Sequence, residues 1–404
     1  MRPNVLVLYQ HYHTPDCPGG ARLYSLLQIL RDRAEVTLIT GAARRRERQT
    51  RDFSWIPDGV TAHEVTVPYA NRMSVPRRIR SYLSFAGRAL ALGTVRARPD
   101  LVYGISTPLS TAAAAAAVAR WHGVPWIFEV RDLWPAFPIQ MGAVPFDWLE
   151  RVLYRAERML YQSADHVVTV SPDMSEYVED TGIASDRVTT VLPGSDLDHL
   201  RSPSAPSPRA LRRQYELPSS PFVLYAGTLG RANDLSSVME AARRCAPEDF
   251  SFVFVGRGYY EPQLRRLATH QSSVHLIPPQ PQHNMGAWYR LADLSLVPFL
   301  DRPVLATNSP AKFFDSLTMG TPVLVTNPGW TKTFVDTHRC GWYVPPSRPD
   351  ALARRLRSLM TSPDTLRAAG RRGEEVARKK FDRAEQFAQI PDIIERVLSR
   401  PPSP

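Results

Sequence analysis

The two residues best suited to chemistry in this sequence are Lys312 and Asp315, in the run Pro-Ala-Lys-Phe-Phe-Asp-Ser at 310–316. Residues three apart are neighbours on one face of a helix. A lysine and a carboxylate beside a free helix N-terminus would suit a nucleotide-sugar. The cation and the backbone amides would bind the diphosphate, and the carboxylate would bind the ribose diol. The alternative is a surface helix with an ordinary Lys–Asp pair, which is common and weak.

The residues around this run predict where the helix begins and ends. Ser309 can cap the helix, and Pro310 suits its first position. Gly320 can end the helix, and Pro322 cannot continue it. We therefore expect a short helix followed directly by a strand at 323–325.

Glycine-bearing loops follow several of the expected strands. The run 227–231 (Gly-Thr-Leu-Gly-Arg) lies between an expected strand and helix, and its glycines and arginine suit a diphosphate. Gly20 ends a Gly-Gly pair after the first strand, where a backbone amide could approach an anion. The run 256–258 (Gly-Arg-Gly) either lines the same site or is a plain turn. No loop matches the G-x-G-x-x-G or P-loop pattern, so neither a dehydrogenase nor ATP hydrolysis is indicated.

Three charged residues, Glu129, Arg131 and Asp132, mark the end of a strand that should be central in the first domain. Charged groups in such a place are costly unless they are paired or used. We expect them to face a ligand cleft, because parallel sheets bind ligands beyond the carboxyl ends of their strands. The alternative is a structural pair of Arg131 with Glu129 or Asp132. His11 and His13 lack a third ligand at metal spacing, so no metal site is predicted.

Apolar runs alternate with helical patterns along almost the whole chain. This alternation predicts an α/β fold with parallel sheets and helices on both faces. It is interrupted at 201–208 (Arg-Ser-Pro-Ser-Ala-Pro-Ser-Pro), a composition that indicates a linker. We therefore expect two doubly wound domains that face each other across a cleft. The expected boundaries are 1–195 for the first domain, 196–220 for the linker, 221–380 for the second domain and 381–404 for a C-terminal helix.

The composition limits the class of protein. The chain has 404 residues, of which 43% are hydrophobic, and this length suggests about two domains. No apolar run approaches the ~20 residues of a membrane-spanning helix, and the start of the sequence shows no signal peptide. Cys17, Cys245 and Cys340 are far apart, which fits a reducing cytosol. The net charge of +11 suggests either an anionic partner or merely solvated arginines.

Four motifs together resemble the retaining GT-B glycosyltransferases of glycosyltransferase family 4. The resemblance covers nearly the whole chain. It is closest to the bacterial branch acting on O-antigen, capsule and related glycans, including amino-sugar transferases of the N-acetylfucosamine type. The motifs are Gly19-Gly20-Ala21-Arg22, Glu129-Val130-Arg131-Asp132-Leu133-Trp134-Pro135, Tyr225-Ala226-Gly227-Thr228-Leu229-Gly230-Arg231 and Ser309-Pro310-Ala311-Lys312-Phe313-Phe314-Asp315.

The resemblance implies two Rossmann-like domains, with the donor nucleotide held mainly by the second. Asp315 would bind the ribose, and Lys312 and Arg231 would face the diphosphate. The base would be uracil, no metal or cofactor would be needed beside the nucleotide-sugar, and the C-terminal helix would cross back onto the first domain. The donor-binding residues that it implies are Gly20, Gly227, Thr228, Arg231, Ser309, Lys312 and Asp315.

In this family the sugar is transferred with retention and no protein nucleophile is established. Catalysis would then depend on positioning and on stabilising the departing diphosphate. We place Glu129, Arg131 and Asp132 near the reacting centre, with Arg131 where the family usually has a histidine. The sequence departs further from the family pattern in its second domain. The Glu-x7-Glu motif keeps its second carboxylate as Asp315, while the first falls on Thr307.

We therefore predict a metal-independent, retaining hexosyl or N-acetylhexosaminyl transferase (EC 2.4) that uses a UDP-sugar. Its acceptor would be a glycan, a polyprenyl-diphosphate-linked sugar or a natural product. The alternatives are a nucleotide-sugar epimerase of related fold and a non-catalytic glycan- or nucleic-acid-binding protein. Nucleic acid is not expected as a partner, because no nucleic-acid-binding module is recognisable.

We expect a cytoplasmic protein that is peripheral at the inner face of the membrane. The residues 76–98 form an expected amphipathic helix rich in arginine, which would meet anionic lipid. The alternative is a helix that packs into the core and leaves its arginines in solvent. Its apolar residues are Tyr82, Leu83, Phe85, Leu90 and Leu92.

Overall fold

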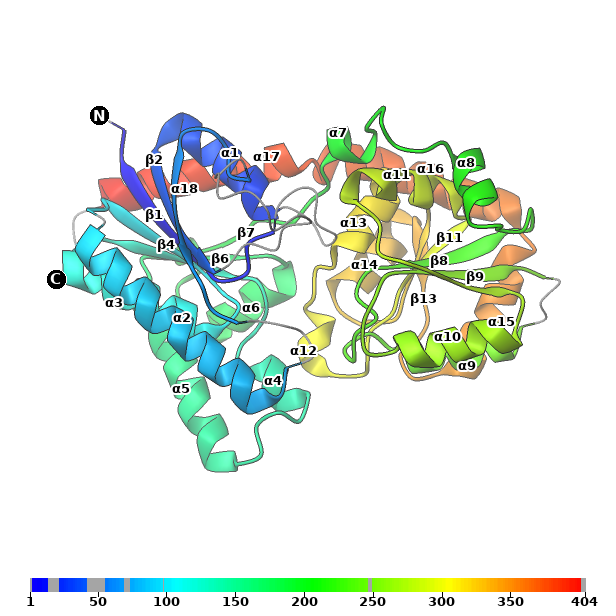
Figure 1. Cartoon of the computed structure of the whole chain (residues 1–404), viewed down its shortest axis with the longest axis horizontal. Helices are drawn as coiled ribbons and strands as arrows, with labels where there is room; N and C mark the ends of the chain where they lie inside the picture. The colour runs from blue at the N-terminus through cyan, green and yellow to red at the C-terminus, as the bar shows by residue number, and fades with distance from the viewer. Residues whose placement is uncertain are drawn as a thin grey trace. The chain divides into compact units, whose positions relative to one another are not determined.

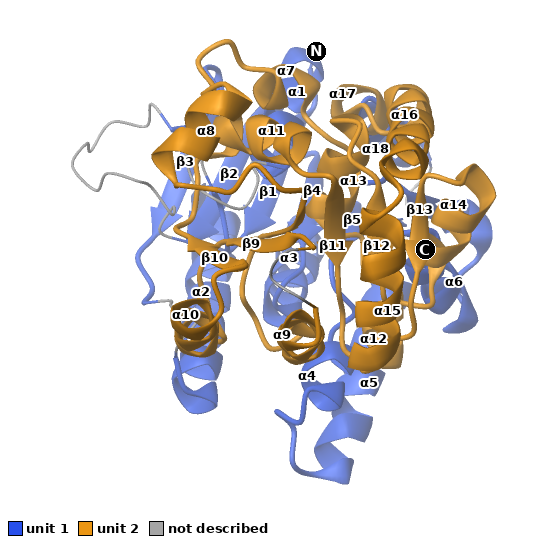
Figure 2. Cartoon of the chain, turned by 90° about the vertical axis from the view of Figure 1, so that its right-hand side faces the viewer, with its two compact units in different colours: residues 1–192, 387–404 blue, residues 193–386 orange. Residues whose placement is uncertain are grey.

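The computed structural model describes residues 2–13, 22–41, 55–68, 73–96, 98–245 and 249–400 (Figure 1). The chain divides into two compact units (Figure 2). Unit 1 contains residues 1–192 and 387–404, and unit 2 contains residues 193–386. Each unit is built on its own parallel sheet with helices on both faces, as the strand–helix alternation predicts.

The sheet of unit 1 has seven strands in the order β3-β2-β1-β4-β5-β6-β7, and all are parallel. The order reverses between β1 and β4, which is the position where doubly wound sheets bind ligands. The strands are β1 (Asn4–Tyr9), β2 (Glu35–Gly41), β3 (Val60–Val65), β4 (Leu101–Ile105), β5 (Trp126–Val130), β6 (His166–Thr169) and β7 (Val188–Thr190).

The C-terminal segment of the chain packs in unit 1. Phe387, Ile390 and Ile394 are buried in the same core as α1 and β1, so the last helix covers the first domain's sheet. The helices of unit 1 are α1 (Arg22–Arg33), α2 (Val75–Arg96), α3 (Leu109–His122), α4 (Ala136–Gln140), α5 (Asp147–Ser163), α6 (Pro172–Asp180) and α18 (Gln389–Ser399), with a 3-10 turn η1 (Ser185–Arg187).

The sheet of unit 2 has six parallel strands in the order β10-β9-β8-β11-β12-β13, which reverses between β8 and β11. Its strands are β8 (Phe222–Ala226), β9 (Ser251–Val255), β10 (Val274–Ile277), β11 (Leu294–Val297), β12 (Val323–Val325) and β13 (Gly341–Tyr343). Its helices are α9 (Leu235–Arg243), α10 (Glu261–His270), α11 (Gln282–Leu291), α12 (Pro303–Ala306), α13 (Ala311–Thr318), α14 (Trp330–His338), α15 (Pro349–Met360), α16 (Pro363–Lys380) and α17 (Arg383–Phe387), the last of which ends at the unit boundary.

The segment 196–220, for which we expected a linker, is instead part of unit 2. It forms α7 (Leu197–Leu200) and α8 (Pro208–Gln214), both of which pack against α11. Leu200 and Leu211 are buried in one cluster with Trp288. The proline and serine content misled the prediction, because Ser207 and Pro208 are the cap and first residue of α8.

The chain enters and leaves unit 2 at two segments that are hydrogen-bonded to each other. The Ser195 amide donates to the Phe381 carbonyl (2.7 Å), and the Arg383 amide donates to the Ser195 carbonyl (3.1 Å). The Arg383 side chain donates to the carbonyls of Pro193 and Gly194. Both segments are therefore fixed to one another beside α13.

Candidate active site

The helix α13 carries the residues that the sequence singled out. It begins at Ala311, with Pro310 in the cap position and no side-chain cap. The prediction that Ser309 caps it is wrong, because the extended backbone of Pro310 takes that place. The Ser309 hydroxyl is buried without a hydrogen-bond partner among the described residues. At the other end Gly320 adopts a left-handed φ of 76°, which ends the helix as predicted.

Lys312 is a partly buried cation without a carboxylate partner in the part of the chain that the structure describes. Its Nζ lies 3.3 Å from the Tyr225 hydroxyl and 3.3 Å from Asn233 Oδ1, over the ring of Tyr225. Burial lowers the pKa of Lys312 to about 7. A lysine so placed would gain strongly from a bound anion, because an anion restores the charge interactions that it lost with water.

The loop after β8 lies against this lysine. Gly227 has a φ of 129°, and a Cβ atom added there would lie 3.3 Å from Lys312 Cε. A side chain at this position would therefore be strained and would crowd the lysine. The next residue, Thr228, accepts hydrogen bonds at its carbonyl from the Tyr225 hydroxyl and from Asn233. Gly227 and Thr228 are both exposed, so the loop backbone is open to a ligand.

Arg231 is exposed, and its guanidinium lies 4.2 Å from the centre of the Tyr259 ring. It belongs to the same loop as Gly227 but, as the structure describes it, has no hydrogen bond to Lys312 or its partners. The structure therefore brings together Gly227, Thr228 and Lys312, with Ser309 just before the same helix. Gly20 lies outside the described residues.

Asp315 points to another environment than Lys312. It is 4% exposed, and its Oδ1 accepts a hydrogen bond of 2.8 Å from the Ser195 hydroxyl. Burial raises the pKa of Asp315 to about 6, against the opposing effect of the nearby Arg383. The ordinary surface Lys–Asp pair that the sequence left open is therefore not formed.

Glu129 is held in a buried ion pair. Its Oε1 accepts from Arg22 at 3.0 Å, and its Oε2 accepts from the Tyr103 hydroxyl at 2.7 Å. The Arg22 guanidinium also lies over the ring of Phe387. With 1% of its surface exposed, Glu129 has no access to a ligand and instead joins α1 to the central strands.

Arg131 and Asp132 follow β5 and are paired with neither Glu129 nor one another. Arg131 donates to the Tyr9 hydroxyl at 2.6 Å, and Asp132 accepts from the Thr107 hydroxyl at 2.8 Å. Burial raises the pKa of Asp132. The alternative prediction, a structural ion pair of Arg131 with Glu129 or with Asp132, is therefore wrong. The two residues lie with Tyr9 and Thr107 at the carboxyl ends of β5, β1 and β4, where the strand order reverses.

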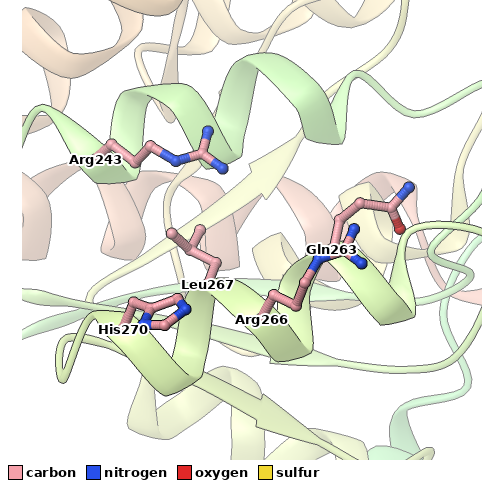
Figure 3. A pocket seen from close by; sticks show the side chains of 5 residues that line it. All are labelled: Arg243, Gln263, Arg266, Leu267 and His270. Atoms are coloured by element: carbon pink, nitrogen blue, oxygen red, sulfur yellow. The ribbon is translucent and has the colours of Figure 1, made fainter.

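A surface hollow of about 330 Å³ in unit 2 lies elsewhere (Figure 3). It is lined from α9 and α10 by Arg243, Gln263, Arg266, Leu267 and His270. Arg243 and His270 are the last residues of their helices, so this hollow extends towards the opposite edge of the sheet from the Gly227 loop. It shares no residue with the predicted site.

The described residues contain no group of three or more His, Cys, Asp or Glu side chains placed to hold a metal ion. None of the helices described is long and apolar enough to cross a membrane.

Two family models match the chain, one in each half. The description "Glycosyl transferase 4-like domain" matches residues 19–194, and "Glycosyl transferases group 1" matches residues 220–362. Together they span most of the sequence. Both descriptions name glycosyl transferases, so the chain is a glycosyltransferase.

Relatives of this glycosyltransferase come from several bacteria. The colanic acid biosynthesis glycosyl transferase WcaI of Escherichia coli K12 is 24% identical over 73% of this chain and 74% of that protein. The D-inositol 3-phosphate glycosyltransferase of Thermobispora bispora is 28% identical over 95% of this chain and 91% of that protein.

Solved structures show that this glycosyltransferase has the GT-B fold. Anabaena Alr3699/HepE, crystallised in complex with UDP-glucose, superposes with a TM-score of 0.72. The alignment covers 98% of this chain and 100% of that chain at 15% identity. Two Rossmann-like units with parallel sheets are the arrangement that the resemblance implied.

Some residues of the site in this glycosyltransferase were missed by sequence reasoning. Tyr225 and Asn233 position Lys312, and Ser195 and Arg383 surround Asp315. Asn233 carried a usable signal, because it follows the Gly227–Arg231 loop that was predicted to bind the diphosphate. Its amide oxygen accepts from the Lys312 ammonium.

Proposed function

We propose that this glycosyltransferase transfers a sugar from a UDP-sugar with retention of configuration and without a metal ion. The observation that carries the proposal is Lys312. It is a partly buried cation without an anionic partner among the described residues, beside the exposed backbone of Gly227 and Thr228. A diphosphate supplies the negative charge that such a site lacks.

The donor would be held mostly by unit 2. Lys312, the backbone amides of the first residues of α13, which no side chain caps, and the Ser309 hydroxyl would bind the diphosphate. Arg231 could leave the Tyr259 ring and add a second cation. Asp315 would bind the ribose as in the family, by exchanging its hydrogen bond with Ser195 for one with a ribose hydroxyl.

The reaction breaks the bond between the sugar C1 and the diphosphate oxygen and forms one between C1 and the acceptor oxygen. In a same-face displacement, the acceptor proton passes to the departing phosphate oxygen, so no protein base is needed. Lys312 and the helix amides would stabilise the charge that develops on UDP. Arg131 and Asp132 would orient the acceptor and the reacting sugar, and Glu129 would position them through Arg22 and the β5 strand.

We propose an N-acetylhexosamine-type donor sugar and a glycan or polyprenyl-diphosphate-linked acceptor, with the enzyme peripheral at the inner face of the membrane. A soluble natural-product acceptor is the second possibility in the same reaction class. The branch resemblance supports the amino sugar. The WcaI relative, named for colanic acid biosynthesis, supports the glycan.

A binding panel tests the donor. Thermal stability is measured with UDP, GDP, TDP, CDP and ADP for the native protein and for Lys312→Met. A ligand at ~100 times its dissociation constant adds ~2.7 kcal/mol of stability. We expect UDP alone to stabilise the native protein and to lose this effect in the variant. Stabilisation by no nucleotide would contradict the proposal.

Product analysis then tests the reaction. UDP-N-acetylhexosamines and UDP-hexoses are incubated with and without glycan acceptors, and UDP release and product anomers are recorded. We expect release that depends on the acceptor and an α-linked product from an α-linked donor. Conversion of the donor sugar without acceptor would identify an epimerase instead.

A further inference from the structure

Exposed apolar side chains are concentrated in unit 1. Among the described residues, ten large hydrophobic side chains are exposed, and nine of them belong to unit 1. Unit 2, of similar size, exposes one, which lies beneath Arg231. The ten are Val75, Ile79, Leu83, Val95, Trp121, Phe146, Trp148, Val152, Met159 and Tyr259. Contiguous exposed apolar patches mark interaction sites, whereas apolar residues scattered singly on a surface are normal, so the arrangement of these side chains matters.

The helix α5 presents one apolar and basic face to solvent. At about 100° per residue, Trp148, Val152 and Met159 lie within ~40° of one another around the helix, with Arg155 beside them. The buried residues Glu157 and Tyr161 lie on the opposite side. Trp148 is 59% exposed and Met159 is 60% exposed, so this face has no partner within the described structure.

The helix α2 adds a second exposed stripe. Val75, Ile79 and Leu83 follow one another at every fourth position and are all exposed. The sequence had assigned Tyr82 and Phe85 to a lipid-facing side, but both are buried in the core. The amphipathic prediction for this helix is therefore corrected: Leu83 is exposed as expected, whereas the two aromatic residues pack inward.

The two stripes lie on the same side of unit 1. In parallel α/β units a helix that follows a strand begins at the carboxyl edge of the sheet, and both α2 and α5 begin there. Both views show their N-terminal ends extending from the same side of this unit (Figures 1 and 2). This is also the edge that carries Arg131 and Asp132. By contrast Val95 and Trp121 end their helices at the opposite edge.

The charges on this surface are mainly positive. Arg77 and Arg80 are exposed on α2, and Arg151 and Arg155 are exposed on α5. On α5 the acidic Glu157 is buried, whereas Asp147 is exposed and Glu150 is partly exposed in the first turn, so the four arginines outnumber two acidic side chains. A two-fold dimer through this face would bring arginines against arginines, which disfavours a second copy of the chain as the occupant.

We propose that the N-terminal halves of α2 and α5, with Phe146, dock on an anionic lipid bilayer. We call this set the α2–α5 surface. Tryptophan and phenylalanine suit the interfacial region of a bilayer, and arginines bind anionic headgroups. This inference rests on the proposed function, because binding to a membrane would bring the enzyme to its lipid-linked acceptor. Docking here would present the acceptor headgroup to the edge of the sheet that carries Arg131.

Vesicle binding tests the proposal. The full chain is floated with vesicles of phosphatidylcholine alone and of phosphatidylcholine with about 30% phosphatidylglycerol, an anionic lipid. We expect at least about tenfold tighter binding to the anionic vesicles, and a blue shift of tryptophan fluorescence. The double variant Trp148→Ser/Val152→Ser should lose most of the binding and the shift. Arg151→Gln/Arg155→Gln should lower anionic binding towards the neutral level.

Trp121→Ser is the matched control, because Trp121 is 71% exposed in the same unit but at the opposite edge. It should bind vesicles as the native protein does. Absence of vesicle binding, or equal loss in the control, would overturn the proposal. Self-association in sedimentation velocity that only the α5 double variant abolishes would assign the surface to a second copy instead. UDP stabilisation, measured in every sample, separates a failure of this inference from a failure of the proposed function.

Discussion

The Ser195 hydroxyl donates a 2.8 Å hydrogen bond to Asp315, 120 positions further along the chain. Ser195 lies in the segment by which the chain enters unit 2, and its backbone is bonded to Phe381 and Arg383 in the segment by which the chain leaves. Without a donor, the Asp315 carboxylate that we propose for the ribose is therefore hydrogen-bonded to Ser195, and Ser195 is bonded in turn to the segment by which the chain leaves unit 2. A nucleotide that binds Asp315 would break the hydrogen bond between Asp315 and Ser195.

Ser195→Ala should lower the free energy of unfolding of unit 2. The substitution leaves Asp315 Oδ1 buried without its donor, which costs about 1–3 kcal/mol. Because a ribose hydroxyl can replace the lost donor, UDP should stabilise the variant by more than it stabilises the native protein. Chemical denaturation with and without UDP measures both effects. Ser204→Ala, at an exposed serine, is the control. An equal UDP effect in all three proteins would argue that Asp315 does not reach the ribose.

Lys312→Met should weaken UDP binding by roughly 10- to 150-fold, the range expected for a lost hydrogen bond to a charged group. The folded protein should be no less stable than the native one, because the variant removes a partly buried cation and keeps a side chain of similar length. Calorimetric titration with UDP and denaturation measure the two quantities.

Lys332→Met removes an exposed lysine that pairs with Asp336 on α14, and serves as the control for loss of a positive charge. It should change neither quantity appreciably. A large loss of stability in Lys312→Met together with unchanged UDP affinity would make Lys312 a structural residue and contradict its proposed role.

UDP affinity should fall as the pH rises above 7. Burial lowers the pKa of Lys312 to about 7, so above this pH the free protein has mainly the neutral amine. A diphosphate prefers the ammonium form, and binding must then take up a proton. The apparent affinity should fall by up to about tenfold per pH unit, since one pKa unit corresponds to 1.36 kcal/mol. Lys312→Met should show a flat profile over pH 7–9.

The stability of the unliganded protein should have the opposite slope. The usual pKa of a lysine is 10.5, so between pH 7 and this value the unfolded chain binds a proton that folded Lys312 does not. The contribution of Lys312 therefore makes folding more favourable as the pH rises through this window. The difference in the free energy of unfolding between the native protein and Lys312→Met, measured across this pH range, gives the contribution of Lys312. A difference that does not change with pH would contradict the lowered pKa.

The sequence predicted most of the strands, because buried parallel strands are short continuous apolar runs. It missed β3, β10 and β13, which lie at sheet edges and are only partly buried, so that their sequences lack a continuous apolar run. It also located α13, because Pro310, Gly320 and Pro322 mark where this short helix can begin and where it must end. It could not identify contacts made by the tertiary fold. Arg22 reaches Glu129 across 107 positions, and nothing in the local pattern around either residue indicates the other.

The linker prediction failed for a local reason. Ser207 and Pro208 were counted as linker composition, although the same two residues are a helix cap and its first residue. Asp196 likewise caps α7 by accepting from the His199 amide. Composition alone treats such residues as chain breakers, whereas their positions relative to Leu200 and Leu211 show that they start short buried helices.

Glu129→Gln and Arg131→Gln should affect different properties, although the residues are two positions apart. Glu129→Gln leaves the buried Arg22 without its carboxylate, and breaking a buried pair in this way costs about 3–5 kcal/mol. Arg131→Gln removes a charged hydrogen bond to Tyr9, which costs about 1.5–3 kcal/mol of stability, and it also removes the cation proposed to act at the reacting centre. We expect Glu129→Gln to melt at markedly lower temperature while keeping its affinity for UDP, which unit 2 binds. We expect Arg131→Gln to stay folded and to lose most of its turnover.

Melting curves, UDP titration and UDP release in the presence of acceptor measure stability, donor binding and turnover in both variants. A stable but inactive Glu129→Gln protein would instead place Glu129 among the catalytic residues.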